Sequence, residues 1–177
     1  NEVEHIIPYL SEIHKDLLLI HGNHEDKDEI AQLTKGYEGI EFIHKKIVKR
    51  GEFVFVGYGG DGFSKRDKEF EAFIKKEKKN FGEAKKLIFL FHGPPKDTLL
   101  DNPYDNYHSG SESYREAIEE LQPLLVLSGH IHEGEHLADT IGKSILINPG
   151  PDGELIDLDL LVKEREKLDK EINSKSK

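Results

Sequence analysis

Three apolar stretches of this 177-residue sequence are each followed by residues of types that can bind a metal ion. LLLIHGNH ends in Asn23 and His24, and LIFLFH ends in His92. LLVLSGHIH supplies His130 and His132. Imidazole nitrogen and amide oxygen are common ligands of Zn, Mn and Fe. A glycine beside each group lets the backbone pass close to a bound ion. The pattern predicts one metal site assembled from three separate segments.

The stretch SGHIHEGEH, residues 128–136, contains two overlapping metal motifs. Gly-His-x-His places His130 and His132 on the same side of an extended segment. His-Glu-x-x-His would instead stack His132 and His136 on one helix face, with Glu133 as the base of a zinc peptidase. An apolar strand ends at residue 128 and Gly134 disfavours a helix, so the first motif is preferred. The peptidase is kept as a lesser alternative, and His136 is interpreted as a non-ligand.

Buried strands should position these groups. Continuous apolar runs of this length are typical of strands covered on both faces, whose carboxyl ends form the ligand crevice of an α/β sheet. We predict strands over residues 16–21, 40–44, 52–56, 86–92 and 124–128, then a hairpin formed by 136–142 and 144–151, and a last strand over 154–160.

Helical periodicity fills most of the remaining sequence. It covers residues 3–13 and 70–81, a short helix capped by Asp26, and a helix opened by a capping box of Ser113 and Glu116. The sequence therefore predicts a layered α/β domain over residues 1–160, followed by a charged helical tail over 161–177. Strands alternate with helices early in the sequence and form hairpins late, which favours a layered α/β sandwich over an all-parallel barrel.

Composition narrows the classes of function. A formal net charge of −10 argues against nonspecific nucleic-acid binding and against a membrane-surface protein. The chain has no cysteine, which makes a cytoplasmic setting the default. Its longest apolar runs are too short to span a bilayer.

A glycine-rich stretch, GYGGDG at residues 57–62, fits the dinucleotide-binding pattern. Residues 63–67 interrupt the junction between glycine and helix that would seat a pyrophosphate. The glycines fit a turn, or backbone passing close to the crevice, equally well.

Four sequence blocks occur in the order found in a known family: LIHGNHED, FLFHGPP, LLVLSGHIHE and ILINPGP. Together they resemble the calcineurin-like metallophosphoesterases, in particular the small Icc-like bacterial and archaeal phosphoesterases. The resemblance covers roughly residues 16–151. It implies an α-β-β-α sandwich and an enzyme that hydrolyses a phosphomonoester or phosphodiester of a small molecule or nucleotide.

The same resemblance implies a site with two divalent ions, of Mn, Fe, Zn or Ni. By position, Asn23, His92 and His130 match ligands of one ion, and His132 matches a ligand of the other. His24 matches the histidine that protonates the leaving group or steadies the phosphate. Two cations about 4 Å apart can share a hydroxide and stabilise charge on a phosphoryl group.

The polar loop over residues 96–111 follows His92. Its position suggests one wall of a substrate site, to which His108 would contribute. An ordinary exposed loop explains the same residues equally well.

Two motifs of the family pattern do not occur before Gly22: Asp-x-His, and Gly-Asp-x-x-Asp. They would supply most ligands of the second ion, so we do not expect full activity of this chain by itself. One interpretation is that the N-terminal strands are missing from the chain, and the absence of Met at position 1 favours it. The other is a catalytically degenerate scaffold for protein binding. We expect the chain alone to fold poorly or to associate, for example as a homo-oligomer. A sharp two-state melt of a soluble monomer would contradict this.

Overall fold

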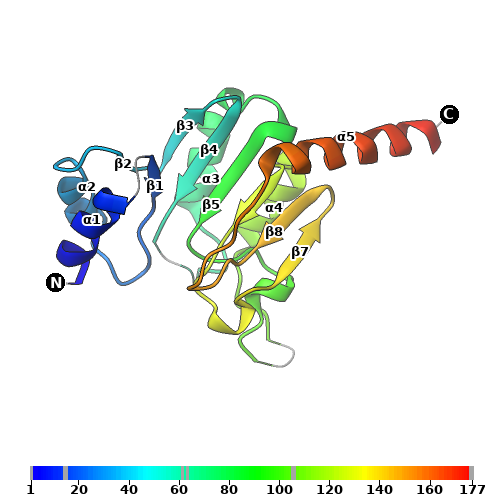
Figure 1. Cartoon of the computed structure of the whole chain (residues 1–177). Coiled ribbons are helices and arrows are strands. Elements are labelled where there is room, and N and C mark those ends of the chain that lie inside the picture. Colours follow the sequence, from blue (N-terminus) through cyan, green and yellow to red (C-terminus); the bar gives the residue numbers. More distant parts are fainter. Residues whose placement is uncertain (1, 14–15, 61, 63, 105–106, 176–177) are drawn as a thin grey trace.

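The central feature of the fold is a six-stranded sheet with the order β3-β4-β5-β6-β8-β7 (Figure 1). The computed structural model describes residues 2–13, 16–60, 62, 64–104 and 107–175. The strands are β3 (Lys46–Arg50), β4 (Phe53–Tyr58), β5 (Leu87–Phe91), β6 (Leu125–Leu127), β7 (Ala138–Ile141) and β8 (Ser144–Ile147). The four inner strands are parallel, and the edge strands β3 and β7 are antiparallel to their neighbours.

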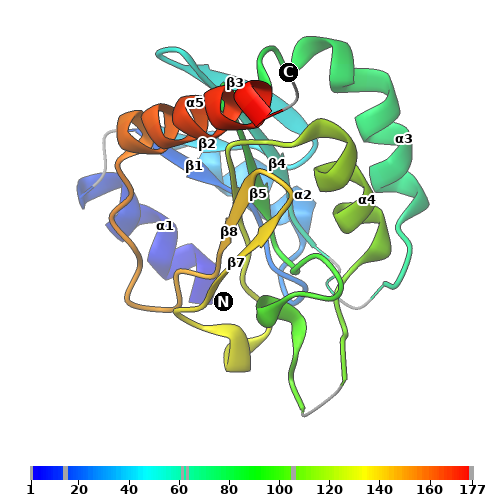
Figure 2. The same cartoon turned by 90° about the vertical axis from the view of Figure 1, so that its right-hand side faces the viewer.

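Helices α3 (Lys68–Glu77) and α4 (Glu112–Leu121) cover one face of this sheet (Figure 2). The core between them contains Phe70, Phe89, Phe91, Tyr114 and Ile118, each at most 2% exposed. Burial of large aromatic side chains dominates the energetics of such a core. Packing of α3 and α4 on this face holds β5 and β6 in place. It therefore also positions the loops that follow these two strands.

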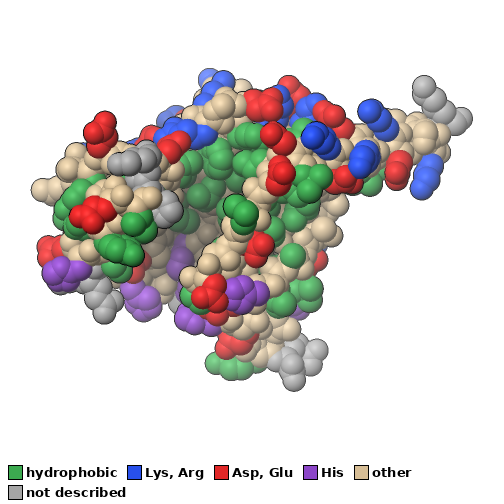
Figure 3. Space-filling view, viewed as in Figure 1, with side chains coloured by type: hydrophobic (Ala, Val, Ile, Leu, Met, Phe, Trp, Pro, Cys, Tyr) green, Lys and Arg blue, Asp and Glu red, His purple; other side chains and the backbone are tan. Residues whose placement is uncertain are grey.

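Helix α5 (Leu158–Lys175) crosses the opposite face and covers only part of it. Leu90, Leu127 and Ile147 are only partly buried there, in the same apolar cluster as Leu161 of α5. Figure 3 shows hydrophobic side chains lining the hollow below this helix. A substantial apolar surface of the sheet therefore stays open beside the ends of β5 and β6.

The predicted strand over residues 154–160 is wrong, because α5 begins at Leu158 within it. The Asp157 carboxylate accepts a hydrogen bond from the Leu160 N–H at 2.9 Å, which satisfies a free donor of the first helical turn. Leu158, Leu161 and Val162 have helical spacing and pack onto the sheet. The alternating apolar residues satisfied both patterns, and tertiary packing selected the helix.

The cap predicted for α4 is also wrong. Ser111 is the N-cap, and its hydroxyl accepts a hydrogen bond from the Tyr114 N–H at 3.4 Å. Ser113 lies inside the helix, and its hydroxyl donates to Glu71 at 2.7 Å. Glu116 pairs with Arg66 on the outer side of α4 instead of closing a capping box.

The N-terminal residues form a second layer, in which α1 (Glu2–Ile13) and α2 (Lys27–Thr34) pack on a two-stranded parallel sheet. Its strands are β1 (Leu17–Leu19) and β2 (Ile40–Phe42). This layer joins the main sheet at the end of β4, where the Gly60 N–H donates to the His21 carbonyl at 2.9 Å. The loop after β1 therefore lies beside the loops after β4 and β5 (Figure 1).

The predicted α/β class is confirmed, with a multi-stranded sheet at its centre. Within the part of the chain that the structure describes, no helix is long and apolar enough to cross a membrane.

Candidate metal centre

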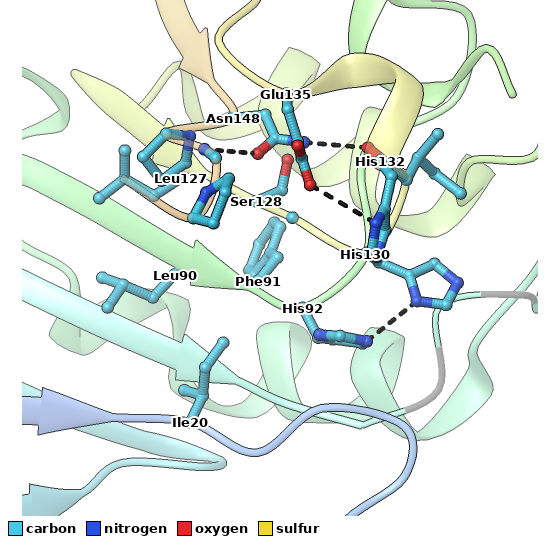
Figure 4. A pocket seen from close by; sticks show the side chains of 15 residues that line it. Ile20, Leu90, Phe91, His92, Leu127, Ser128, His130, His132, Glu135 and Asn148 are labelled. Atoms are coloured by element: carbon cyan, nitrogen blue, oxygen red, sulfur yellow. Dashed lines mark hydrogen bonds and ion pairs between the residues drawn. The ribbon is translucent and has the colours of Figure 1, made fainter. Parts of the chain in front are cut away.

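Three of the predicted metal ligands meet at the carboxyl ends of the strands. The Nε2 atom of His92 lies 2.9 Å from Asn23 Oδ1. The same atom lies 3.0 Å from His130 Nδ1 (Figure 4). His92 follows β5, His130 follows its neighbour β6, and Asn23 follows β1. Strands β5 and β6 are parallel neighbours and end at the same edge of the main sheet. Asn23 comes from the N-terminal layer, which the hydrogen bond from the Gly60 N–H to the His21 carbonyl holds beside that edge.

The spacing of these atoms fits a divalent metal ion. Ligand bonds of about 2.1 Å place neighbouring donors roughly 3.0 Å apart around an octahedral ion and roughly 3.4 Å apart around a tetrahedral one. Two imidazoles and one amide oxygen suit Zn, Mn or Fe. Among the described residues, no three His, Cys, Asp or Glu side chains are grouped to hold a metal, so this mixed set is the candidate.

The environment of His92 keeps its ring ready to bind a cation. Burial lowers the pKa of His92 to about 4; the neighbouring His130 adds to this effect and Glu25 opposes it. The ring is therefore neutral at pH 7, as a metal ligand must be. Glu25 accepts a hydrogen bond from the Gly22 N–H at 2.7 Å, and a Cβ atom on Gly22 would lie 2.6 Å from that carboxylate. Glu25 was not among the predicted site residues, although it directly follows the Asn-His pair.

His130 has an unusual backbone conformation, with φ of 69°. Left-handed φ is uncommon for a non-glycine residue, and such strain is often found at functional sites. Gly62 packs against its ring, because an added Cβ would lie 2.8 Å from His130 Cδ2. The loop over residues 57–62 is therefore backbone passing close to the site, as one of the two interpretations held. Residue 61 of that loop lies outside the described residues.

His132 is placed differently from the other three predicted ligands. It lies in a short 3₁₀ helix (His132–Gly134) with its side chain 86% exposed, and its Nδ1 is 3.6 Å from Glu135 Oε1. His136 has a left-handed φ of 60°, and its Nε2 is 3.9 Å from Asp152 Oδ2. The peptidase motif requires both histidines on one α-helix, so this segment does not have the geometry of a zinc peptidase.

His92 and His130, two of the three donors, border a pocket of about 480 Å³ (Figure 4). His92, His130 and His132 line it together with apolar residues of the open sheet face, including Leu90 and Leu127. The site thus combines a polar end that can hold a cation with an apolar wall.

Comparison with known proteins identifies the family. A family model described as "Metallophosphoesterase, calcineurin superfamily" matches residues 28–164, more than half of the chain. The chain belongs to the calcineurin superfamily of metallophosphoesterases. The matched range begins after Asn23 and His24, so their assignment depends on the motif and on the geometry above.

Solved structures show the same fold. The chain is similar to the protein TT1561 of Thermus thermophilus, with a TM-score of 0.67 and 20% identity over 90% of this chain and 75% of that one. A second crystal structure gives a TM-score of 0.69 and 21% identity over 84% of this chain. This metallophosphoesterase chain spans 62% of the length of that second structure. No curated protein matches the sequence significantly.

Asn148 holds the histidine loop of this metallophosphoesterase in place. It is 2% exposed, its amide donates to the Ile131 carbonyl at 3.1 Å, and its Oδ1 accepts from the Gly150 N–H at 3.1 Å. Ile131 lies between His130 and His132, so the amide fixes the backbone between them. The sequence signal was the Asn-Pro-Gly turn after a strand, to which residue chemistry alone assigned no role.

The remaining two predicted site residues are His24 and His108. His24 has an exposed side chain beside Asn23, and its charge contributes to lowering the pKa of His92. His108 donates from Nδ1 to the Oδ1 atom of Asp101 at 2.7 Å. Its role toward a substrate stays a prediction.

His44 and His21 form a separate pair with ring centroids 4.6 Å apart. The Nδ1 atom of His44 accepts a hydrogen bond from the Gly59 N–H at 3.0 Å. Burial and, to a smaller extent, the neighbouring His21 lower the pKa of His44 to about 4.

We expect His44 to make the fold sensitive to acid. Its pKa is about 4 in the folded chain and about 6.5 when unfolded, so below pH 6.5 the unfolded state binds the proton more readily. The stabilising contribution is complete above pH 6.5 and is lost as the pH falls toward 4. His44→Asn keeps an acceptor for the Gly59 N–H but does not titrate. It should reduce the stability lost between pH 7.5 and 5 by about 1 kcal/mol, allowing for partial exposure.

The measurement is urea unfolding at several pH values. His5→Asn, on the exposed side of α1, is the matched control and should leave the pH dependence unchanged. Equal slopes for His44→Asn and the parent chain would show that His44 does not couple protonation to folding.

Proposed function

We propose that this chain forms a metal-dependent phosphoester hydrolase site in which Asn23, His92 and His130 hold one divalent ion. The observation that carries the proposal is the convergence of Asn23 Oδ1 and His130 Nδ1 on His92 Nε2, at 2.9 and 3.0 Å. Membership of the metallophosphoesterase superfamily supports the class of reaction. The substrate would be a phosphomonoester or phosphodiester of a small molecule or nucleotide.

The proposed roles follow from the chemistry of each group. A bound divalent ion would lower the pKa of water toward 7 and stabilise charge on the phosphoryl oxygens. Neutral His92 offers its Nε2 lone pair to the ion without first losing a proton from an imidazolium. His24, exposed beside Asn23, would hold the proton that the leaving alkoxide requires.

We also propose a second divalent ion, for which this chain supplies fewer ligands. His132 would be one of its ligands, and Glu135, whose Oε1 lies 3.6 Å from His132 Nδ1, is the carboxylate best placed to be another. Two donors are too few for a closed site, and the ion's full ligand set would include the Asp-x-His and Gly-Asp-x-x-Asp groups of the family pattern.

A protein-binding scaffold is the second candidate, favoured by the exposure of His132 and the absence of those two motifs. Retention of His24 argues against it, since a scaffold has no need of a proton donor.

Hydrolysis with added metal tests the proposal. The chain is loaded with Mn²⁺ and assayed on p-nitrophenyl phosphate and on bis(p-nitrophenyl) phosphate. We expect Mn²⁺-dependent release of nitrophenolate. On an alkyl phosphate ester, whose alkoxide leaving group requires a proton, we expect His24→Asn to lower kcat by roughly 10²–10⁴-fold while bound metal is retained.

Three other outcomes would reject the proposal in different ways. Absence of bound Mn²⁺ would favour the scaffold. Bound metal without hydrolysis of either ester would remove the hydrolase assignment. Casein cleavage that is lost in Glu133→Ala would restore the peptidase.

A further inference from the structure

A second pocket, of about 460 Å³, lies where the N-terminal layer meets β4 and α3. Four cationic side chains line it: Lys27 at the start of α2, Lys45 between β2 and β3, and Arg66 and Lys68 at the start of α3. Two carboxylates, Asp67 and Glu69, also line it. We name it the lysine pocket. An excess of cations around one cavity is unexpected in a chain whose net charge is −10.

Two of these cations are available to a ligand. Lys45 pairs with Glu69, and Arg66 pairs with Glu71 at 2.8 Å. Lys27 and Lys68 form no ion pair with any residue that the structure describes. Both are exposed, so each ammonium group can reach an anion in the pocket.

Among the described residues, the carboxylate of Asp67 forms no ion pair with these lysines. Its Oδ1 caps α3 by accepting from the Phe70 N–H at 2.9 Å, and its Oδ2 accepts from the Tyr58 hydroxyl at 2.9 Å. Both α2 and α3 begin at the pocket, and the positive ends of their dipoles reinforce the cationic field.

Two histidines add polar nitrogen atoms to the lining. Because His44 Nδ1 accepts from the Gly59 N–H and the ring is neutral, its proton is on Nε2, which is therefore a donor. His21 lines the pocket and is 7% exposed, and its Nδ1 has no hydrogen-bond partner within the described chain. Gly60 lies against this ring, since an added Cβ would be 2.7 Å from His21 Nε2.

We propose that the lysine pocket binds a phosphate-type oxyanion, either free phosphate or the phosphate group of an organic ester. A compact, doubly charged group with several acceptor oxygens matches two lysine ammonium groups and an imidazole N–H. A volume of about 460 Å³ lies in the usual range of small-molecule sites and exceeds what a single phosphate requires.

The pocket is separate from the metal centre. The loop over residues 57–62 lies between them, with Gly60 against His21 and Gly62 against His130. Binding in the lysine pocket should therefore occur in the absence of any metal ion.

The test uses the full chain, labelled with ¹⁵N, treated with EDTA, and titrated with inorganic phosphate or with AMP at matched ionic strength. We expect saturable shifts in the amide signals of Lys27, Gly59 and Gly60. Tighter binding of phosphate would identify free phosphate as the ligand, and tighter binding of AMP would identify a phosphate ester. Chloride giving the same shifts, or no saturation at millimolar ligand, would overturn the proposal.

Variants connect the binding to the lysines. The double variant Lys27→Gln, Lys68→Gln should weaken phosphate binding by roughly tenfold or more. Lys35→Gln removes the same charge from the other end of α2 and should leave the affinity unchanged. Unchanged affinity in the double variant, or equal weakening in the control, would overturn the proposal. Because metal is absent throughout, failure here would leave the hydrolase proposal intact.

Discussion

Replacing His92 with alanine is expected to abolish specific binding of a divalent metal. Its Nε2 atom contacts both other donors, so the variant leaves Asn23 and His130 without the ligand between them. Loss of an outer partner of a metal ligand typically costs 10–100-fold in affinity, and loss of this direct ligand should cost more. The measurement is the dissociation constant for Mn²⁺ or Zn²⁺ by titration calorimetry.

His136→Ala is the matched control for this variant. His136 belongs to the same histidine-rich loop, but its side chain is 50% exposed and its nearest charged partner is Asp152. The control should bind metal as the parent chain does. If His92→Ala retained the metal and His136→Ala lost it, the metal would be bound by the peptidase motif and not by the proposed site.

Replacing Asp101 with alanine should cause the largest loss of stability, about 3–5 kcal/mol. Asp101 is fully buried, in a 3₁₀ helix (Leu99–Asp101) within the loop over residues 96–111, of which residues 105 and 106 lie outside the described part. Its carboxylate accepts hydrogen bonds of 2.7–3.0 Å from His108 and from the backbone N–H groups of Asp97, Thr98 and Gly110. Alanine would leave the buried N–H groups of Thr98 and Gly110 without an acceptor, whereas Asp97 and His108 are exposed and can turn to water.

The free energy of unfolding in urea measures this effect. Asp152→Ala is the control, because that carboxylate is 89% exposed and lies 3.9 Å from its partner. Exposed pairs of this kind contribute about 0–1 kcal/mol. A loss below about 1 kcal/mol for Asp101→Ala would show that the loop is held by other contacts.

Much of the metal centre could be predicted, because short segments of the sequence indicate both the strands and the metal-binding residues that follow them. Each of the three strands is a continuous apolar run, and each is followed directly by a residue able to bind a metal. Parallel pairing of β5 and β6 then brings His92 and His130 to one edge of the sheet. Asn23 follows β1 of the separate two-stranded sheet, so its place beside His92 depends on how that layer packs.

Features that depend on distant partners could not be predicted in this way. Strand β3 has the sequence KIVKR and lies at the edge of the sheet. Because three of its five residues are charged, it lacks the apolar pattern that indicates a strand. The start of α5 depended on packing against the sheet, and the lysine pocket brings together residues 21, 27, 44 and 68. No local pattern joins those four positions. His132 has the correct spacing for a ligand, yet the turn after Ile131 leaves it exposed.

The most direct test is to locate the metal. Crystals of the chain grown with Mn²⁺ are measured at a wavelength where manganese scatters anomalously. The account predicts an anomalous peak bonded to Asn23 Oδ1, His92 Nε2 and His130 Nδ1 at about 2.1–2.2 Å. A peak between His132 and His136, or no ordered peak near His92, would contradict it.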